Sequence, residues 1–108
     1  MAGEHVHSTE HWDITVAPDI PGARLHFRLA PRTPVADFLE LTHAEMRDYW
    51  TALGWVYDAY ELTYYCVVWR CGDQQRTGGA DQHAAAYVVV GDPDSPTIAR
   101  HTLSGAAQ

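Results

Sequence analysis

The sequence predicts a two-layer α+β domain in which one main helix packs on a mostly antiparallel sheet of four to five strands. Three observations indicate this class: two alternating segments near the N-terminus, one well-capped helical segment, and two β-branched segments in the second half. The expected order of elements is β-β-α-β-β-(β). A β-grasp-like topology and an open curved sheet both satisfy that order.

The first two strands are predicted at 12–16 and 25–29. Apolar and polar residues alternate over both segments, which is the pattern of a half-buried strand. The stretch from Pro18 to Gly22 between them is rich in turn-forming residues. The two strands are therefore expected to form a hairpin. Its inward-facing side chains would be Trp12, Ile14, Val16, Leu25, Phe27 and Leu29.

A helix is predicted at about 43–53. Thr42 and Glu45 have the spacing of a capping box, in which each side chain bonds to the other residue's backbone N–H. Gly54 is expected to end the helix in a left-handed conformation. The predicted inward stripe consists of Met46, Tyr49, Trp50 and Leu53. Before the helix, Thr33-Pro34 has the composition of a short helical turn, and residues 38–41 fit a helical turn or an extended segment.

The remaining strands are predicted after the helix. Residues 60–69 are β-branched and aromatic on both faces, as in a long central strand that is buried on both sides. Residues 84–90 form a second β-branched segment, and 97–103 a last edge strand. The polar, glycine-rich stretch 72–83 between them is long enough for a mobile loop.

The predicted domain spans residues 10–103, with a flexible N-terminal tail at 1–9 and a C-terminal tail at 104–108. No apolar stretch is long enough to cross a membrane. The first residues lack the basic and apolar regions of a signal peptide. The expected location is the cytoplasm.

The charge pattern argues against nucleic-acid binding. The formal net charge is −7 and all seven basic residues are arginine, a composition that also suggests a GC-rich bacterial source. DNA-binding surfaces need clustered cations to neutralise phosphates, and the densest arginine group is only Arg24, Arg28 and Arg32. The fourteen acidic residues are spread along the chain, as on an acidic, solvated surface.

The aromatic residues suggest a binding surface. Eight of the twelve lie between Tyr49 and Trp69. Tyrosine and tryptophan combine an apolar body with a polar tip, so they serve in cores, in interfaces and in ligand pockets. The favoured interpretation is a small accessory protein that binds another protein or its own copy through an aromatic-rich sheet face. The candidate contact residues are Trp50, Trp55, Tyr57, Tyr60, Tyr64, Tyr65 and Trp69.

The alternative is a small enzyme or carrier for an aromatic or polycyclic metabolite. Trp50, Tyr64 and Trp69 would bind the ligand between helix and sheet. The candidate acid–base residues are Asp58, His26 and His101. The sequence contains no nucleophile elbow and no glycine-rich phosphate loop.

The two cysteines are not expected to pair. On one strand, Cys66 and Cys71 would be about 16 Å apart, beyond the reach of a disulfide. Cys71 and His83 are the candidate metal ligands, with Asp73 or Asp81 as a third. Their spacing matches no standard metal site, so neither a metal nor a cofactor is predicted.

Overall fold

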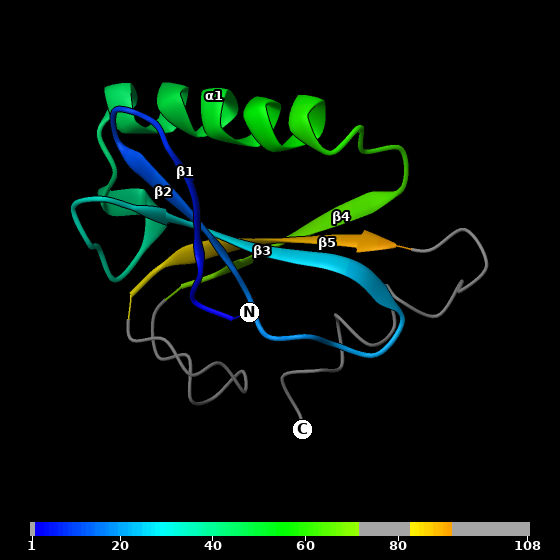
Figure 1. Ribbon diagram of the computed structural model, residues 1–108. Helices are drawn as coiled ribbons and strands as arrows, with labels where there is room; N and C mark the ends of the chain where they lie inside the picture. The colour runs from blue at the N-terminus through cyan, green and yellow to red at the C-terminus, as the bar shows by residue number, and fades with distance from the viewer. Residues whose placement is uncertain (1, 72–82, 92–108) are drawn as a thin grey trace.

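The computed structural model describes residues 2–71 and 83–91 and confirms the two-layer α+β class. Five strands form one open sheet in the order β1-β2-β3-β5-β4, and every neighbouring pair is antiparallel. The helix α1 lies across one face of this sheet (Figure 1). Of the two topologies that fit the sequence, the open sheet is the one observed. Its elements are β1 (His5–Ser8), β2 (Trp12–Val16), β3 (Ala23–Pro31), the 3-10 helix η1 (Phe38–Glu40), α1 (His43–Ala59), β4 (Tyr65–Arg70) and β5 (Ala85–Gly91).

The N-terminal hairpin forms as predicted. β2 and β3 pair antiparallel, with Ile14 opposite Leu29 and Val16 opposite Phe27. Trp12, Ile14, Phe27 and Leu29 lie in the core as expected, and Leu25 packs against it. Val16, which was also expected to face inward, is half-buried. Arg24, His26 and Arg28 alternate with the inward residues of β3. The predicted tail at 1–9 differs, because it contains β1. β1 pairs with β2, and its Val6 packs against the core.

The segment before α1 also differs from one expectation. No helical turn forms at Thr33-Pro34. The turn lies instead at η1, where Asp37 and Glu40 form a capping box. This turn buries the Phe38 ring, which belongs to the hydrophobic core.

The helix begins at its predicted capping box but continues past Gly54. Five further residues are helical because Val56 is fully buried and Trp55 stacks on His7. The left-handed residue that ends the helix is Glu61, at φ 51°. The Leu62 N–H then bonds to the Tyr57 carbonyl at 3.0 Å, as in a Schellman motif. Burial of Leu62 therefore fixes the end of the helix more strongly than the glycine does.

The predicted central strand at 60–69 is wrong in extent and in place. Residues 60–64 belong to the helix end and a turn, and β4 lies at the edge of the sheet that the described strands form. β5 lies inside the sheet between β3 and β4. The alanines and valines of β5 are buried on both faces. The large aromatic side chains of β4 would not fit in such a position.

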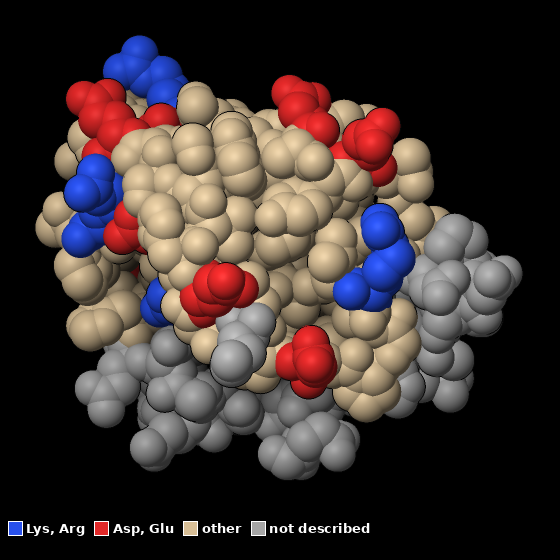
Figure 2. All heavy atoms as spheres, in the orientation of Figure 1, with Lys and Arg blue, Asp and Glu red and all other residues tan. Residues whose placement is uncertain are grey.

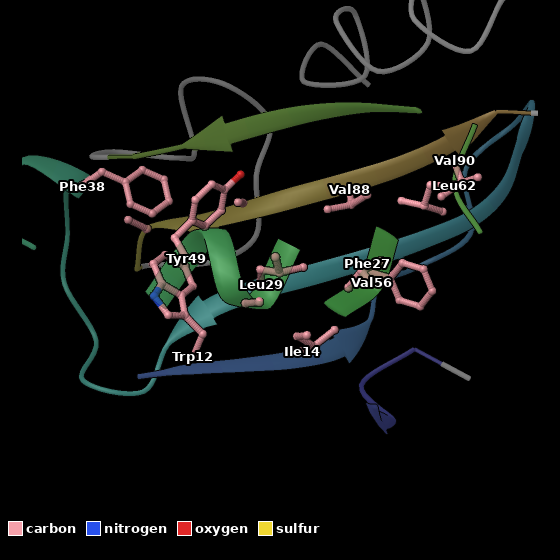
Figure 3. Close-up of a cluster of buried hydrophobic side chains, with 13 residues drawn as sticks. Trp12, Ile14, Phe27, Leu29, Phe38, Tyr49, Val56, Leu62, Val88 and Val90 are labelled. Carbon is pink, nitrogen blue, oxygen red and sulfur yellow. The ribbon is translucent and has the colours of Figure 1, made fainter. Parts of the chain in front are cut away.

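The core fills the layer between α1 and the sheet (Figure 3). The helix contributes Tyr49, Ala52 and Val56 at the centre of this layer. The predicted inward stripe is therefore rotated, since Trp50 is 64% exposed. The largest fully buried side chains include Trp12, Tyr49, Ile14, Leu29 and Leu62. None of the described helices is long and apolar enough to span a bilayer.

The predicted edge strand at 97–103, the predicted tail at 104–108 and residues 72–82 of the loop predicted at 72–83 lie outside the described residues.

Candidate functional site

Exposed aromatic side chains gather along the edge where α1 lies beside β4. Trp50 and Tyr57 stand two helical turns apart on α1, and Tyr65 and Trp69 share the helix-facing side of β4. These four rings are 64%, 48%, 39% and 43% exposed, respectively. The Tyr57 and Tyr65 rings meet edge to face at 6.1 Å. We call these four residues the α1–β4 surface.

Tyr49 connects this surface to the core. It is 2% exposed, and its hydroxyl accepts a hydrogen bond of 3.1 Å from Trp69 Nε1. Figure 3 shows the hydroxyl pointing toward β4. Burial raises the pKa of the Tyr49 hydroxyl above its ordinary value, and the hydrogen bond from Trp69 offsets only part of that rise. Tyr49 is therefore a neutral phenol that holds the Trp69 indole in place.

The backbone of β4 adds a second feature to the surface. Among the described strands, β4 has only β5 as a neighbour. The Gly91 N–H bonds to the Tyr64 carbonyl at 2.7 Å, and the ladder places Cys66, Val68 and Arg70 in bonded pairs with β5. The N–H and C=O groups of Tyr65, Val67 and Trp69 therefore point away from β5. They form a row of donors and acceptors directly beside the exposed rings.

The opposite edge of the sheet is protected. β1 is four residues long, and its pairing with β2 shifts register between His5 and His7. Short edge strands and bulges discourage pairing with another chain. β4 has six residues paired in an unbroken register with β5. It is the better of the two edges for adding a strand.

The other predicted contact residues occupy different places. Trp55 stacks on His7 of β1, with ring centroids 4.1 Å apart and planes 4° apart. Tyr60 packs on Phe27 at 4.7 Å. Tyr64 is exposed in the turn before β4. Apart from Tyr64, the candidate aromatic residues thus divide between the edge of the core and the α1–β4 surface, and they do not gather on the sheet face opposite α1.

The space between helix and sheet is occupied by side chains. Tyr49, Ala52 and Val56 of α1 contact the sheet there and are at most 2% exposed. Trp50 and Trp69, which the metabolite hypothesis placed around an internal pocket, lie at the rim of this layer. A ligand would meet them at the surface.

The candidate acid–base residues lie on different sides of the molecule. Asp58 is exposed near the end of α1. His26 points to the sheet face opposite α1, in the same row as Cys66 and Val89. The sheet separates the two side chains, so the structure does not bring them together. His101 lies outside the described residues.

His26 has a defined setting. Its Nδ1 lies 2.7 Å from the Pro18 carbonyl oxygen, which can only accept, so Nδ1 carries the proton. Burial lowers the pKa of His26 from 6.5, and the charge of Arg70 adds to this, while the Pro18 bond and Asp19 act in the opposite direction. In the neutral ring, Nε2 keeps a lone pair.

The lowered pKa of His26 predicts acid sensitivity. The folded protein binds this proton less tightly than the unfolded chain, whose histidine titrates near 6.5. The His26 contribution to stability should therefore be complete above pH 6.5 and should fall as the pH drops toward the folded-state pKa. Urea unfolding from pH 7.5 to 5 would measure this for wild type and His26→Gln. A wild-type stability slope equal to that of the variant would contradict the prediction.

A serine, a histidine and an aspartate meet near β1, but in an order that does not suit nucleophilic catalysis. The Ser8 hydroxyl donates to Asp13 at 2.6 Å and lies 2.8 Å from His5 Nε2. In a catalytic triad the histidine stands between the other two and accepts the serine proton. Here the serine stands in the middle, so the histidine cannot act as its base. Arg32 Nε lies 3.7 Å from Asp13 and holds the acid in this network.

The two cysteines and two of the candidate metal ligands lie within the described residues. Cys66 and Cys71 are both free, as expected. Within residues 2–71 and 83–91, no three His, Cys, Asp or Glu side chains gather as a metal site would require. The candidate ligands Cys71 and His83 both lie within those ranges, whereas Asp73 and Asp81 do not.

Basic and acidic side chains are mixed on the face of the molecule shown in Figure 2. In the view of Figure 2, the arginine side chains stand apart from one another and acidic side chains lie among them. A basic area of the kind that binds a phosphate backbone is not formed on this face.

The comparisons with known proteins identify the fold. No family model and no curated protein sequence matches this chain. Among solved structures, it is similar to a "Hit Like Protein" at a TM-score of 0.68 and 18% identity, over 82% of this chain and 85% of that one. It is also similar to a HIT family hydrolase from Clostridium thermocellum at 0.67 and 19%, over 91% and 87%.

A third likeness is to the C. elegans NitFhit protein, at a TM-score of 0.65 and 18% identity. It covers 95% of this chain but 26% of that one, so the shared unit is one part of a larger protein there. The domain therefore has a HIT-like fold. At these identities the likeness concerns the fold alone.

Proposed function

We propose that this domain is a protein-binding module that adds an extended segment of a partner to the edge of β4 that faces away from β5. The observation that carries the proposal is the row of outward N–H and C=O groups at Tyr65, Val67 and Trp69 beside the exposed rings of the α1–β4 surface. In strand addition the backbone supplies affinity, and pockets for alternate side chains supply specificity. Exposed tryptophan and tyrosine are the residues that most often anchor an interface.

Charge favours another protein over a second copy. Each chain carries a formal net charge of −7 and no lysine, so two copies repel each other at long range. A neutral or basic segment meets no such barrier. Analytical ultracentrifugation separates the cases: a monomer at high concentration fits a different partner, and a dimer that Val67→Pro dissociates would make the second copy the partner.

The experiment that tests the module uses a displayed library of random dodecapeptides, selected on the wild-type protein. The selected peptides are then measured on Val67→Pro and Val67→Ala. Both variants remove the branched valine side chain, but only the proline also removes the outward N–H. We expect peptides to bind Val67→Ala and to lose at least tenfold in affinity on Val67→Pro. Thermal unfolding of both variants verifies that they are folded.

Peptides that bind both variants equally, or a library that yields no binder, would contradict strand addition at β4. The affinity of the selected peptides for Trp69→Ala provides a second test of the proposed binding site. The Trp69 ring contributes to the proposed anchor but is not part of the ladder with β5, so this variant should weaken binding while it preserves the sheet.

A second candidate is a small hydrolase or ligand-binding protein. The Clostridium thermocellum neighbour is described as a hydrolase, and one observation on this chain also favours the candidate. His26 and Tyr87 have ring contact at 5.7 Å on the sheet face opposite α1. With Nδ1 bound to Pro18, the Nε2 of His26 would be the base in such an enzyme.

A hydrolase screen with ester and phosphate-ester substrates tests the second candidate. Turnover that His26→Gln abolishes and Asp58→Asn preserves would support this function over the module.

A further inference from the structure

Three aromatic rings meet at one end of the α1–β4 surface. The Trp50 ring lies 5.3 Å from the Tyr49 ring at 66°, and the Trp69 ring lies 5.2 Å from it at 78°. Tyr49 is buried beneath, while the two indoles are 64% and 43% exposed. Two accessible indoles thus flank one buried phenol. Each indole has a π-system whose face is electronegative.

Two acidic residues belong to the turn that contacts this cluster. Phe38 contacts the Trp69 ring at 4.2 Å, and it lies between Asp37 and Glu40 in η1. The Asp37 carboxylate accepts from the Leu39 N–H at 2.9 Å, and the Glu40 carboxylate accepts from the Asp37 N–H at 3.0 Å. Both carboxylates therefore cap the turn whose Phe38 ring contacts Trp69. The chain as a whole is acidic and has no lysine, so its field also attracts cations.

A strand added to β4 would place a side chain at this cluster. Alternate residues of such a strand face α1, and the residue paired with Trp69 would have its Cβ about 5 Å from the Trp69 Cβ. A long side chain at that position reaches the space next to Trp50 and Tyr49. The domain would then bind the backbone of the segment and this one side chain at the same time.

We infer that Trp50, Tyr49 and Trp69 form a binding site for a cationic side chain, an arginine or a methylated lysine, carried by the partner segment. This inference rests on the proposed function for its context, but the site itself accepts a free cation of the same chemistry. Guanidinium and alkylammonium groups bind to indole faces, and nearby carboxylates strengthen the attraction.

The test is a titration of the intact protein with N-acetyl-arginine amide, N-acetyl-trimethyl-lysine amide and the neutral N-acetyl-citrulline amide. The readout is the set of indole N–H signals in 15N-correlated NMR spectra. We expect the two cations to shift the Trp50 and Trp69 signals at millimolar concentrations, and citrulline to bind about fivefold more weakly or not at all. The Trp12 signal should stay in place, because its N–H is buried against the Glu45 carbonyl at 2.7 Å.

Matched variants complete the design. Trp50→Ala removes one exposed wall and should abolish the preference for cations over citrulline. Tyr64→Ala removes a comparably exposed ring that lies outside the α1–β4 surface, in the turn before β4, and should leave the preference unchanged. Equal shifts with the cations and citrulline, or a cation preference that persists in Trp50→Ala, would overturn the inference.

The outcome is separable from that of the proposed function. Library peptides that need the β4 edge but bind equally with arginine or citrulline opposite Trp69 would overturn the cation site and leave the module standing. Cation binding by the free amides, with no peptide that depends on Val67, would support the site and contradict the module.

Discussion

Trp12→Ala should cost about 3–5 kcal/mol of folding free energy, the largest effect we expect from a single substitution in this domain. Trp12 is fully buried, and its ring packs against Tyr49 at 5.2 Å and Phe38 at 6.1 Å. Its Nε1–H donates to the Glu45 carbonyl at 2.7 Å and so ties β2 to the first turns of α1. Alanine would remove the ring, the cavity would not fill, and this link would be lost.

Urea unfolding followed by far-UV circular dichroism measures the loss. Trp12→Phe keeps an aromatic ring and removes the hydrogen bond, so its cost should be intermediate. Trp50→Ala is the matched control, because that tryptophan is 64% exposed and its removal should change stability by no more than about 0.5 kcal/mol. A loss of under about 1 kcal/mol in Trp12→Ala would show that Trp12 is not central to the core.

Asp48→Ala should cost about 2–3 kcal/mol, because one carboxylate oxygen joins the β1–β2 turn to α1. Asp48 Oδ2 accepts from the Thr9 hydroxyl at 2.6 Å and from the His11 backbone N–H at 2.7 Å. The Thr9 hydroxyl oxygen in turn lies 3.2 Å from the Trp12 N–H. Alanine would leave both donors without this acceptor and loosen the turn that precedes Trp12.

Asp58→Ala is the control for Asp48→Ala. Both acids lie on α1, but Asp58 is exposed, so its loss should be close to neutral. Asp48→Asn, which keeps an acceptor oxygen without the charge, should cost less than alanine. A double-mutant cycle with Thr9→Val would give the coupling energy. Zero coupling would mean that the Thr9–Asp48 bond does not stabilise the domain.

The hairpin, the start of the helix and the last described strand were predictable from the sequence because their causes are local. Alternation over 12–16 and 25–29 requires one face to be buried, whichever elements cover it. The Thr42–Glu45 capping box satisfies helix N–H groups within four residues. The valines at 88–90 favour a strand in any sheet.

The end of α1 and the position of β4 depended on distant residues. Gly54 carries a local stop signal, but burial of Val56 and the stacking of Trp55 on His7 outweigh it. Nothing near 60–69 distinguishes a central from an edge strand. The position of β4 in the sheet was decided by β5, because the small side chains of β5 fit between β3 and β4.

The proposed binding surface was likewise predictable from the sequence only in part. The sequence pointed to the residues, since Trp50, Tyr57, Tyr65 and Trp69 were all among the aromatic candidates, but the face they would occupy was not visible in it. Helix rotation turned Trp50 outward, and the strand order left the backbone of β4 with a free edge among the described strands. Local chemistry therefore determined which segments fold into helix and strand, while packing between segments far apart in the chain determined which rings are buried and which remain available to a partner.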